Sequence, residues 1–320
     1  MTSVDAGITQ VSGNGTGTTD RFPSPHRRGR GARHLTRWLF VAPAIVFVGV
    51  FFGYPIVKNV TMSLQEYTTQ TFYTGEAPWV GIANYLTVIR SSLFNETMLN
   101  TGLFTVGSII VQFILGLALA LFFKRNFPLN GLLRSLLLLP WLLPIIASSA
   151  VWKWMLDQDS GALNQFLGLF GIPHTAWLVS PNLALIAVIG VNIWLGIPFN
   201  TTILYSGLQA VPEELYEAAS LDGATGWKAF WNITWPSIRP VVSVVIVLGV
   251  VYTLKVVDLI LGLTGGGPAN STQTLAIWAY QKSFVQFLFG PGAAISNILI
   301  VVSLIFAMVY LYITRKENDQ

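Results

Sequence analysis

Between two long apolar segments the chain reads Pro212-Glu213-Glu214-Leu215-Tyr216-Glu217-Ala218-Ala219-Ser220-Leu221-Asp222-Gly223. Pro212 suits the first turn of a helix, and the two glutamates after it lie where the helix dipole favours negative charge. Leu215, Ala218 and Ala219 recur at i, i+3 and i+4, which places them in one apolar stripe. The pattern predicts a short helix outside the membrane, with a small and nearly flat apolar face.

The residues that follow predict a turn and a second helix. Gly223 is placed to end the first helix in a left-handed conformation. Thr225 is expected to cap a second short helix that runs to about Ile233, before Pro236 leads into the next apolar segment. A helix resting on a lipid surface would favour Lys, Arg and large apolar residues. This one carries Glu and Ala instead, so a protein partner fits better.

Composition places the rest of the chain in a membrane. Of 320 residues, 53% are hydrophobic and only 10% are charged, against about 25% charged in an ordinary soluble domain. The mean hydropathy is +0.60. The chain has no cysteine, no HExxH pair and no GxxxxGK[ST] phosphate loop. We therefore expect no metal site, no cofactor, no catalytic residues and no ATPase site of its own.

Six apolar segments approach the roughly 20 residues that cross a bilayer, and each must be helical to satisfy its backbone in lipid. The sequence therefore predicts an all-α polytopic membrane protein with a helix–turn–helix loop at about 208–240. Residues 1–34 are expected to form a disordered, Arg-rich tail, and residues 35–320 the transmembrane domain. Prolines interrupt the third and fourth segments and predict kinks there. The expected spans are Trp38–Val57, Leu103–Phe123, Leu132–Met155, Leu183–Tyr205, Val241–Leu263 and Ala293–Ile313.

The distribution of Lys and Arg predicts the orientation of these spans. Cations concentrate in the amino-terminal tail, in the flanks between the second and third and the fourth and fifth spans, and after the sixth. Because cytoplasmic loops carry this excess, both termini are predicted to be cytoplasmic. The tail arginines are expected to attract anionic lipid rather than nucleic acid.

The loop resembles a signature of binding-protein-dependent ABC importer permeases, E-A-A-x-x-x-G-x(9)-I-x-L-P. The matching residues are Glu217, Ala218, Ala219, Gly223, Ile233 and Pro236, with Trp235 where the family usually has Leu. The resemblance implies that this loop is a coupling helix that docks into a cytoplasmic ABC ATPase dimer. The residues then expected to couple to the ATPase are Leu215, Glu217, Ala218, Ala219, Leu221 and Gly223.

A second resemblance narrows the family to carbohydrate uptake. Asp258-Leu259-Ile260, followed by residues 263–272, resembles the end of the fifth core helix of such importers, in the subunit type of the larger maltose permease chain and glycerol-3-phosphate permeases. It implies a heterodimer with a second permease subunit, an external sugar-binding protein and a carbohydrate substrate. It also implies seven substrate-binding positions, although these residues could instead serve only to pack the helices together. The implied substrate positions are Leu195, Gly196, Phe199, Gly249, Tyr252, Thr253 and Val256.

Two further features leave alternatives open. Lys255 and Asp258, at i and i+3, are expected to pair on one helix face rather than contact substrate. The amphipathic stretch Leu275 to Phe287 either receives the binding protein or packs against the rest of the domain.

Other protein classes fit the sequence less well. An ion-gradient-driven secondary transporter would show an intramembrane ionisable relay or inverted repeats, and we find neither apart from Lys255 and Asp258. A membrane enzyme would need a cluster of catalytic groups. Asp157 and Asp159 form a close carboxylate pair, but no other such group is near them in the sequence.

Overall fold

The computed structural model describes residues 40–318, so the predicted tail (1–34) and Trp38 lie outside the described residues. The chain divides into two compact units, Met1–Pro55 and Ile56–Gln320. The first apolar helix begins at Phe40 and continues to Ser63 through a π-helical turn, η1 (Gly49–Gly53), and α2 (Tyr54–Ser63). None of the 18 residues in its most apolar stretch is buried.

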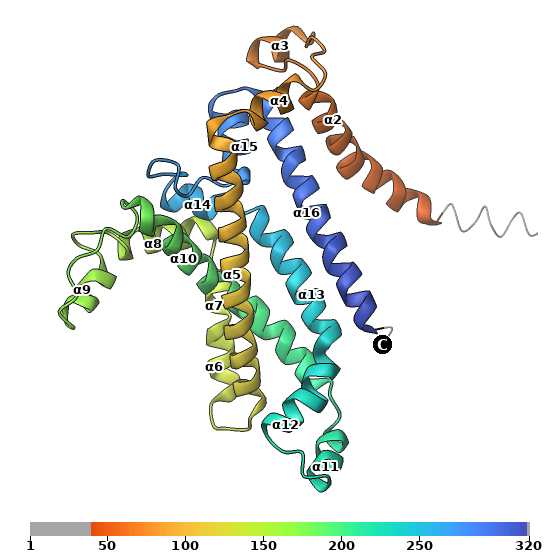
Figure 1. Cartoon of the computed structure of the whole chain (residues 1–320), viewed down its shortest axis with the longest axis vertical. Helices are drawn as coiled ribbons and strands as arrows, with labels where there is room; N and C mark the ends of the chain where they lie inside the picture. Colours follow the sequence, from red (N-terminus) through yellow and green to blue (C-terminus); the bar gives the residue numbers. More distant parts are fainter. Residues whose placement is uncertain (1–39, 319–320) are drawn as a thin grey trace, which may run out of the picture. The chain divides into compact units, whose positions relative to one another are not determined.

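The second unit is a bundle of long apolar helices (Figure 1). Counting Phe40–Ser63, five helices in the described part of the chain are long and apolar enough to cross a membrane, and a bent pair could make a sixth. The prediction of an all-α polytopic fold is therefore confirmed. The four in this unit are α5 (Ser92–Lys124), α10 (Pro181–Gln209), the helix Trp227–Leu254 and α16 (Phe289–Asn318).

The third predicted span is not one straight helix. It divides into α6 (Asn130–Leu137), α7 (Leu139–Leu142) and α8 (Ile145–Met155), and the chain bends by 95° at the last break. Pro144 disfavours helical backbone at the residue before it, and Leu143 is accordingly extended, with ψ 142°. The predicted proline kink is thus a corner rather than a bend within one helix.

The fifth predicted span also breaks, and here the prediction of one continuous helix to Leu263 is wrong. The helix ends at Leu254, residues 255–257 are not helical, and α14 (Asp258–Leu263) begins anew. Lys255 and Asp258 therefore do not share a helix face, and the predicted pair is not formed. Instead, the Lys255 ammonium lies 4.7 Å from the centroid of the Tyr252 ring.

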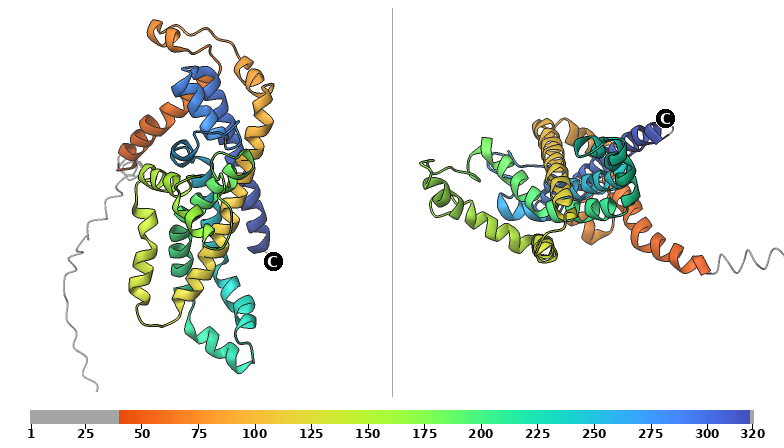
Figure 2. Two further views of the ribbon diagram at one scale, coloured as in Figure 1. Left: turned by 90° about the vertical axis from the view of Figure 1, so that its left-hand side faces the viewer. Right: turned by 90° about the horizontal axis from the view of Figure 1, so that it is seen from below.

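The fourth predicted span is one helix, since α10 continues through Pro198, and the proline expected to interrupt this span does not divide it. It packs along α5, and the two backbones approach closely at Gly116, where an added Cβ would lie 2.7 Å from the Asn200 Cβ. Two apolar clusters surround this contact, one including Val188 and Leu259 and the other Leu204 and Ile238. Figure 2 shows α5 and α10 side by side.

Short helices close the end of the bundle opposite α11 (Glu213–Leu221): α3 (Thr69–Thr74), α4 (Ala83–Ile89), α15 (Leu275–Tyr280) and a π-helical turn, η3 (Gln281–Val285). Another short helix, α9 (Ala162–Gly168), lies to one side of the bundle (Figure 1). Leu275 and Trp278 of α15 pack against Val88 and Ile295 in a third apolar cluster. The first half of the stretch Leu275 to Phe287 thus packs inside the domain, whereas Phe284 and Phe287 are exposed.

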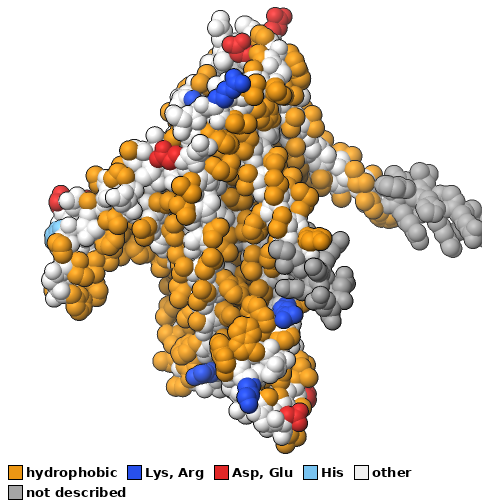
Figure 3. All heavy atoms as spheres, in the orientation of Figure 1, with side chains coloured by type: hydrophobic (Ala, Val, Ile, Leu, Met, Phe, Trp, Pro, Cys, Tyr) orange, Lys and Arg blue, Asp and Glu red, His pale blue; other side chains and the backbone are white. Residues whose placement is uncertain are grey.

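The outer surface of the long helices is apolar, and charged side chains gather toward the ends of the bundle (Figure 3). Exposed Leu, Ile, Val and Phe side chains run along α5, for example at Leu103, Val106 and Ile110. In water such a surface would be a large aggregation-prone patch, whereas in a bilayer it meets hydrocarbon. The surface therefore agrees with the membrane placement predicted from composition.

Candidate substrate pocket and coupling helix

The short helix predicted within residues 212–223 is present as α11 (Glu213–Leu221). Pro212 is its N-cap residue, and Glu213 and Glu214 occupy its first turn. Gly223 adopts φ +73°, as predicted, and the Ala224 N–H donates to the Ala219 carbonyl oxygen at 2.8 Å. This six-to-one bond, with the left-handed glycine before it, is the Schellman arrangement that ends a helix.

The prediction for the second helix is partly wrong. Gly226, not Thr225, is its N-cap residue, and no side chain caps it. The Thr225 backbone carbonyl accepts from the Lys228 N–H at 3.2 Å instead. The helix does not stop near Ile233, because α12 (Trp227–Ala229) continues through a π-helical turn, η2 (Phe230–Thr234), into α13 (Trp235–Leu254). One helix of 28 residues therefore connects the loop to the membrane interior.

The residues predicted to couple to an ATPase lie together on α11 and in the turn that follows it. Leu215 is 46% exposed and Leu221 is 90% exposed, so both side chains are accessible to a partner. Glu217 and Ala218 are also exposed, and Ala219 is half-buried. The structure thus leaves an apolar patch with one carboxylate free for a partner. Its coupling role stays a prediction.

Tyr216, on the other side of α11, was not singled out from the sequence. Its hydroxyl lies 2.9 Å from the Thr234 hydroxyl and accepts a hydrogen bond from the Lys124 ammonium at 3.1 Å. The same ammonium lies 4.2 Å from the centroid of the Tyr216 ring. Tyr216 therefore fastens α11 to the end of α5 and to the beginning of the helix Trp227–Leu254.

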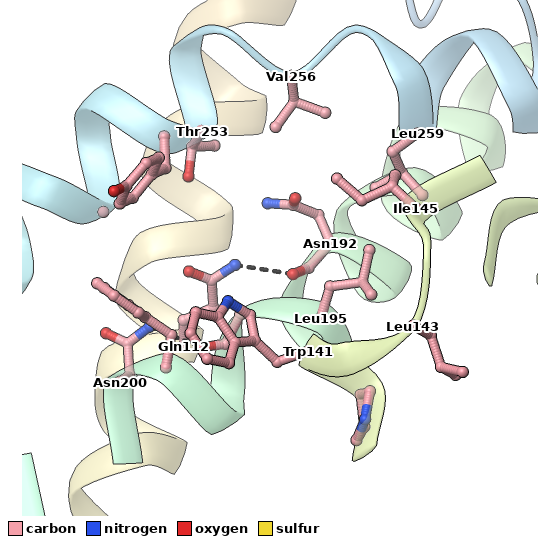
Figure 4. A pocket seen from close by; sticks show the side chains of 15 residues that line it. Gln112, Trp141, Leu143, Ile145, Asn192, Leu195, Asn200, Thr253, Val256 and Leu259 are labelled. Atoms are coloured by element: carbon pink, nitrogen blue, oxygen red, sulfur yellow. Dashed lines mark hydrogen bonds between the residues drawn. The ribbon is translucent and has the colours of Figure 1, made fainter. Parts of the chain in front are cut away.

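A cavity of ≈ 330 Å³ lies between α5, α7, α10 and α13 (Figure 4). Ligand pockets of about 300–1,000 Å³ are usual for small molecules. The structure brings all seven predicted substrate positions into its lining: Leu195, Gly196, Phe199, Gly249, Tyr252, Thr253 and Val256. That these residues bind substrate stays a prediction.

Three carboxamides in the lining were missed. The Gln112 Nε2 donates to the Asn192 backbone carbonyl at 2.8 Å, and the Asn200 Nδ2 donates to the Gly196 carbonyl at 2.9 Å. The Asn192 Nδ2 is buried and has no hydrogen-bond partner. A signal was available in the sequence, because lone polar residues inside apolar spans are rare and commonly functional.

Aromatic rings form one wall of the cavity. The ring centroid of Phe199 lies 6.3 Å from that of Trp141 and 5.7 Å from that of Tyr252. Trp141 belongs to α7, directly before the corner at Leu143 and Pro144. The break in the third span thus brings a ring that the sequence did not single out into the same wall as two predicted substrate residues.

The possibility of an enzymatic centre at Asp157 and Asp159 finds no support in the geometry. The Asp157 carboxylate caps a turn, accepting from the backbone N–H and the hydroxyl of Ser160, both at 2.8 Å. These bonds, and one from the Asp159 N–H, hold the pKa of Asp157 below its usual value. No group of three or more His, Cys, Asp or Glu that could hold a metal occurs within residues 40–318.

Apolar helices around a small cavity, with an exposed helix hydrogen-bonded to the helix that forms one cavity wall, are the arrangement of a membrane transport subunit. The chain belongs to the family of binding-protein-dependent transport system inner membrane components, whose family model matches residues 112–318. It is thus an ABC transporter permease, and the alternative of an ion-gradient-driven secondary transporter is disfavoured.

Relatives cover nearly the whole chain. It is 35% identical to the trehalose/maltose transport system permease protein of Thermococcus litoralis, over 88% of this chain and 94% of that one. It is 31% identical to the sulfoquinovosyl glycerol transport system permease protein of Agrobacterium fabrum, over the same shares. The diacetylchitobiose uptake system permease protein of Streptomyces coelicolor is 28% identical, over 98% and 95%.

A solved structure has the same fold. It is a chain of a bacterial ABC transporter involved in the import of the acidic polysaccharide alginate, and it superposes with a TM-score of 0.77. The match covers 90% of this chain and 99% of that chain at 22% sequence identity.

Proposed function

We propose that this chain is the translocating permease of an ATP-driven sugar importer and that the cavity between α5, α10 and α13 holds the sugar during passage. The observation that carries the proposal is that seven residues on two different helices and just after one of them, all implied by the resemblance to carbohydrate importer permeases, line one cavity. Relatives named for the transport of trehalose and maltose and of diacetylchitobiose support a carbohydrate substrate.

The partners follow from the single coupling helix. A second, different permease subunit completes the pathway, and a cytoplasmic ABC ATPase dimer receives one coupling helix from each. An external sugar-binding protein delivers the substrate, as the family description supports. We propose no catalytic residue, metal or cofactor for this chain, and its sequence carries no phosphate loop. ATP hydrolysis therefore belongs to the partner.

Mechanical coupling runs through the helix Trp227–Leu254. At 1.5 Å per residue its 28 residues extend over about 40 Å, from the end that Tyr216 contacts to Gly249, Tyr252 and Thr253 in the cavity wall. When ATP draws the ATPase subunits together, α11 is displaced and this helix moves one wall of the cavity against α10. The cavity then opens outward, and hydrolysis returns it to the inward-facing state.

Membrane placement is part of the proposal. Lys124, Arg125 and Lys228 lie at the end of the bundle that carries α11, and this end is assigned to the cytoplasm of a bacterial cell. Residues 35–320 then form the transmembrane domain with both termini cytoplasmic, and residues 1–34 a cytoplasmic tail. The apolar outer surface faces lipid, and no nucleic acid is a partner.

The experiment that tests the proposal is ATP hydrolysis by the complete complex in proteoliposomes, with a panel of binding-protein-loaded sugars and glycerol phosphates. Stimulation by one compound supports the importer function and names the substrate. A complex that hydrolyses ATP but responds to none of the panel overturns the assignment to sugars. A chain that binds no ATPase overturns the importer function itself.

A further inference from the structure

The lining of the cavity contains no formal charge. Among its fifteen residues the polar side chains are three carboxamides, the Thr253 hydroxyl, the Tyr252 phenol and the Trp141 indole, and the remainder are apolar residues and glycine. A cavity built for an anion would present Arg, Lys or a cluster of backbone N–H groups.

The hydrogen-bonding capacity of these groups is only partly used. One Nε2 hydrogen of Gln112 goes to the Asn192 carbonyl, which leaves its Oε1 as an acceptor. Asn200 likewise keeps its Oδ1 after its Nδ2 donates to Gly196. The Asn192 Nδ2 keeps both donors, although the residue is only 7% exposed. In Figure 4 its carboxamide points toward the space between Thr253, Val256 and Gln112.

An unpaired buried donor costs free energy that an acceptor from a ligand would recover. Sugar hydroxyls both donate and accept, so one class of ligand satisfies the free Asn192 Nδ2, the two carboxamide oxygens and the Thr253 hydroxyl together. The ring wall of Trp141, Phe199 and Tyr252 offers an apolar face to sugar C–H groups. A carboxylate, phosphate or sulfonate would lose its hydration there without gaining a counter-ion.

We infer that this cavity selects an uncharged polyhydroxy ligand, a neutral sugar, and that Asn192 supplies the donor that recognises it. The inference rests on the proposed function and deepens it. The fold does not decide charge, because the structural neighbour belongs to an importer of an acidic polysaccharide. Lys255 lies near the wall, but its ammonium is on the Tyr252 ring and it is not part of the lining.

The charge class is tested with the complete complex in proteoliposomes by comparing neutral disaccharides with uronic-acid, sulfonated and phosphorylated sugars. We expect a neutral sugar to stimulate ATP hydrolysis and the charged compounds to leave it at the basal rate. Stimulation by an anionic sugar overturns the charge inference and leaves the sugar importer standing. Stimulation by no sugar overturns both. Lys255→Met should keep the neutral response, and loss of that response would show that a cation is needed.

The role of Asn192 is tested separately with Asn192→Leu, which keeps the approximate volume and removes the donor. The half-saturating concentration of the stimulating sugar should rise by roughly 3- to 10-fold, the worth of one net hydrogen bond. The matched control is Ser108→Ala, since this α5 hydroxyl is also buried and unpaired but does not line the cavity. An unchanged concentration for Asn192→Leu in a complex that assembles normally, or an equal rise for the control, overturns the role of Asn192.

Discussion

The Tyr216 hydroxyl lies 2.9 Å from the Thr234 hydroxyl, and this contact joins the exposed helix α11 to the first turns of the helix that continues into the cavity wall. Without it, α11 would be held to the bundle mainly by the two chain segments at its ends. With it, and with the Lys124 ammonium on the same hydroxyl, α11 is bonded to both α5 and the helix Trp227–Leu254, so we expect a displacement of α11 to reach both helices.

Tyr216→Phe should weaken coupling without loss of folding. The change removes both hydroxyl bonds, each worth about 0.5–1.5 kcal/mol net, but keeps the ring in its apolar cluster. We expect sugar uptake per ATP hydrolysed to fall by roughly 3- to 10-fold. Tyr205→Phe is the control, because that hydroxyl bonds only Gln209, on its own helix. An equal loss in both variants would contradict the proposed role of Tyr216.

Gly223→Asp should insert into the membrane normally yet separate uptake from ATP hydrolysis. An added Cβ at Gly223 meets nothing within 4 Å, so the cost is confined to the φ of +73°, on the order of 1–2 kcal/mol. The carboxylate adds a negative charge to the turn proposed to contact the ATPase. Gly223→Asn carries a similar backbone cost without the charge and should couple better. Wild-type uptake by Gly223→Asp would refute the proposed role of the loop.

Two cavity glycines should respond differently to substitution. At Gly249 a Cβ would meet only Ile109, at 3.9 Å, so Gly249→Val should fold normally and fill the cavity. Uptake should fall by about 10-fold or more, because a mismatch of a single methylene group in a binding pocket costs at least this factor. At Gly196 a Cβ would overlap the Gln112 carboxamide, so Gly196→Ala should destabilise the fold by about 1–3 kcal/mol. Thermal unfolding and uptake, measured together, separate the two effects.

The turn at Asp157 should loosen in acid. The bonds from the Ser160 N–H and hydroxyl lower the pKa of this carboxyl below its usual value of 3.8. A group whose pKa is depressed on folding stabilises the fold above its unfolded pKa and loses that contribution as the pH falls through its folded pKa. The thermal stability of Asp157→Asn should therefore lie slightly below wild type near neutral pH and converge with it in acid. A gap that persists unchanged in strong acid would contradict this account.

Much of the fold follows from local sequence, because apolar length and glycine conformation are local properties. The end of α11 at Gly223 and the placement of α10 and α16 were predictable for this reason. The break after Leu254 was not predicted, because Val256 and Val257 continue the apolar run and Lys255 and Asp258, which flank the break, were interpreted as a pair on one helix face. The cap at Thr225 failed because the helix begins two residues later and continues into the span.

Part of the lining of the candidate pocket could be predicted from the sequence. Motif resemblance supplied seven positions on α10, on α13 and just after α13, whereas Gln112 lies on α5, 80 residues from the Asn192 carbonyl that it contacts. No spacing rule connects residues so far apart, and only the packing of α5 on α10 brings them together. The place of Trp141 in the lining was not predicted for a similar reason, because it depends on the corner that follows this residue.

The corner at Leu143 and Pro144 has a consequence for the permeability barrier. Pro144 has no N–H to donate to the Pro140 carbonyl oxygen and Leu143 is extended, so the helical hydrogen-bond pattern is interrupted at this corner. In hydrocarbon a carbonyl oxygen without a helical donor must find water or another donor. A hydrated corner beside the cavity would be a path for proton leak whenever no sugar is bound. The Trp141 ring, which directly precedes the corner and lies against Phe199, is the group that would have to keep such water out between transport cycles.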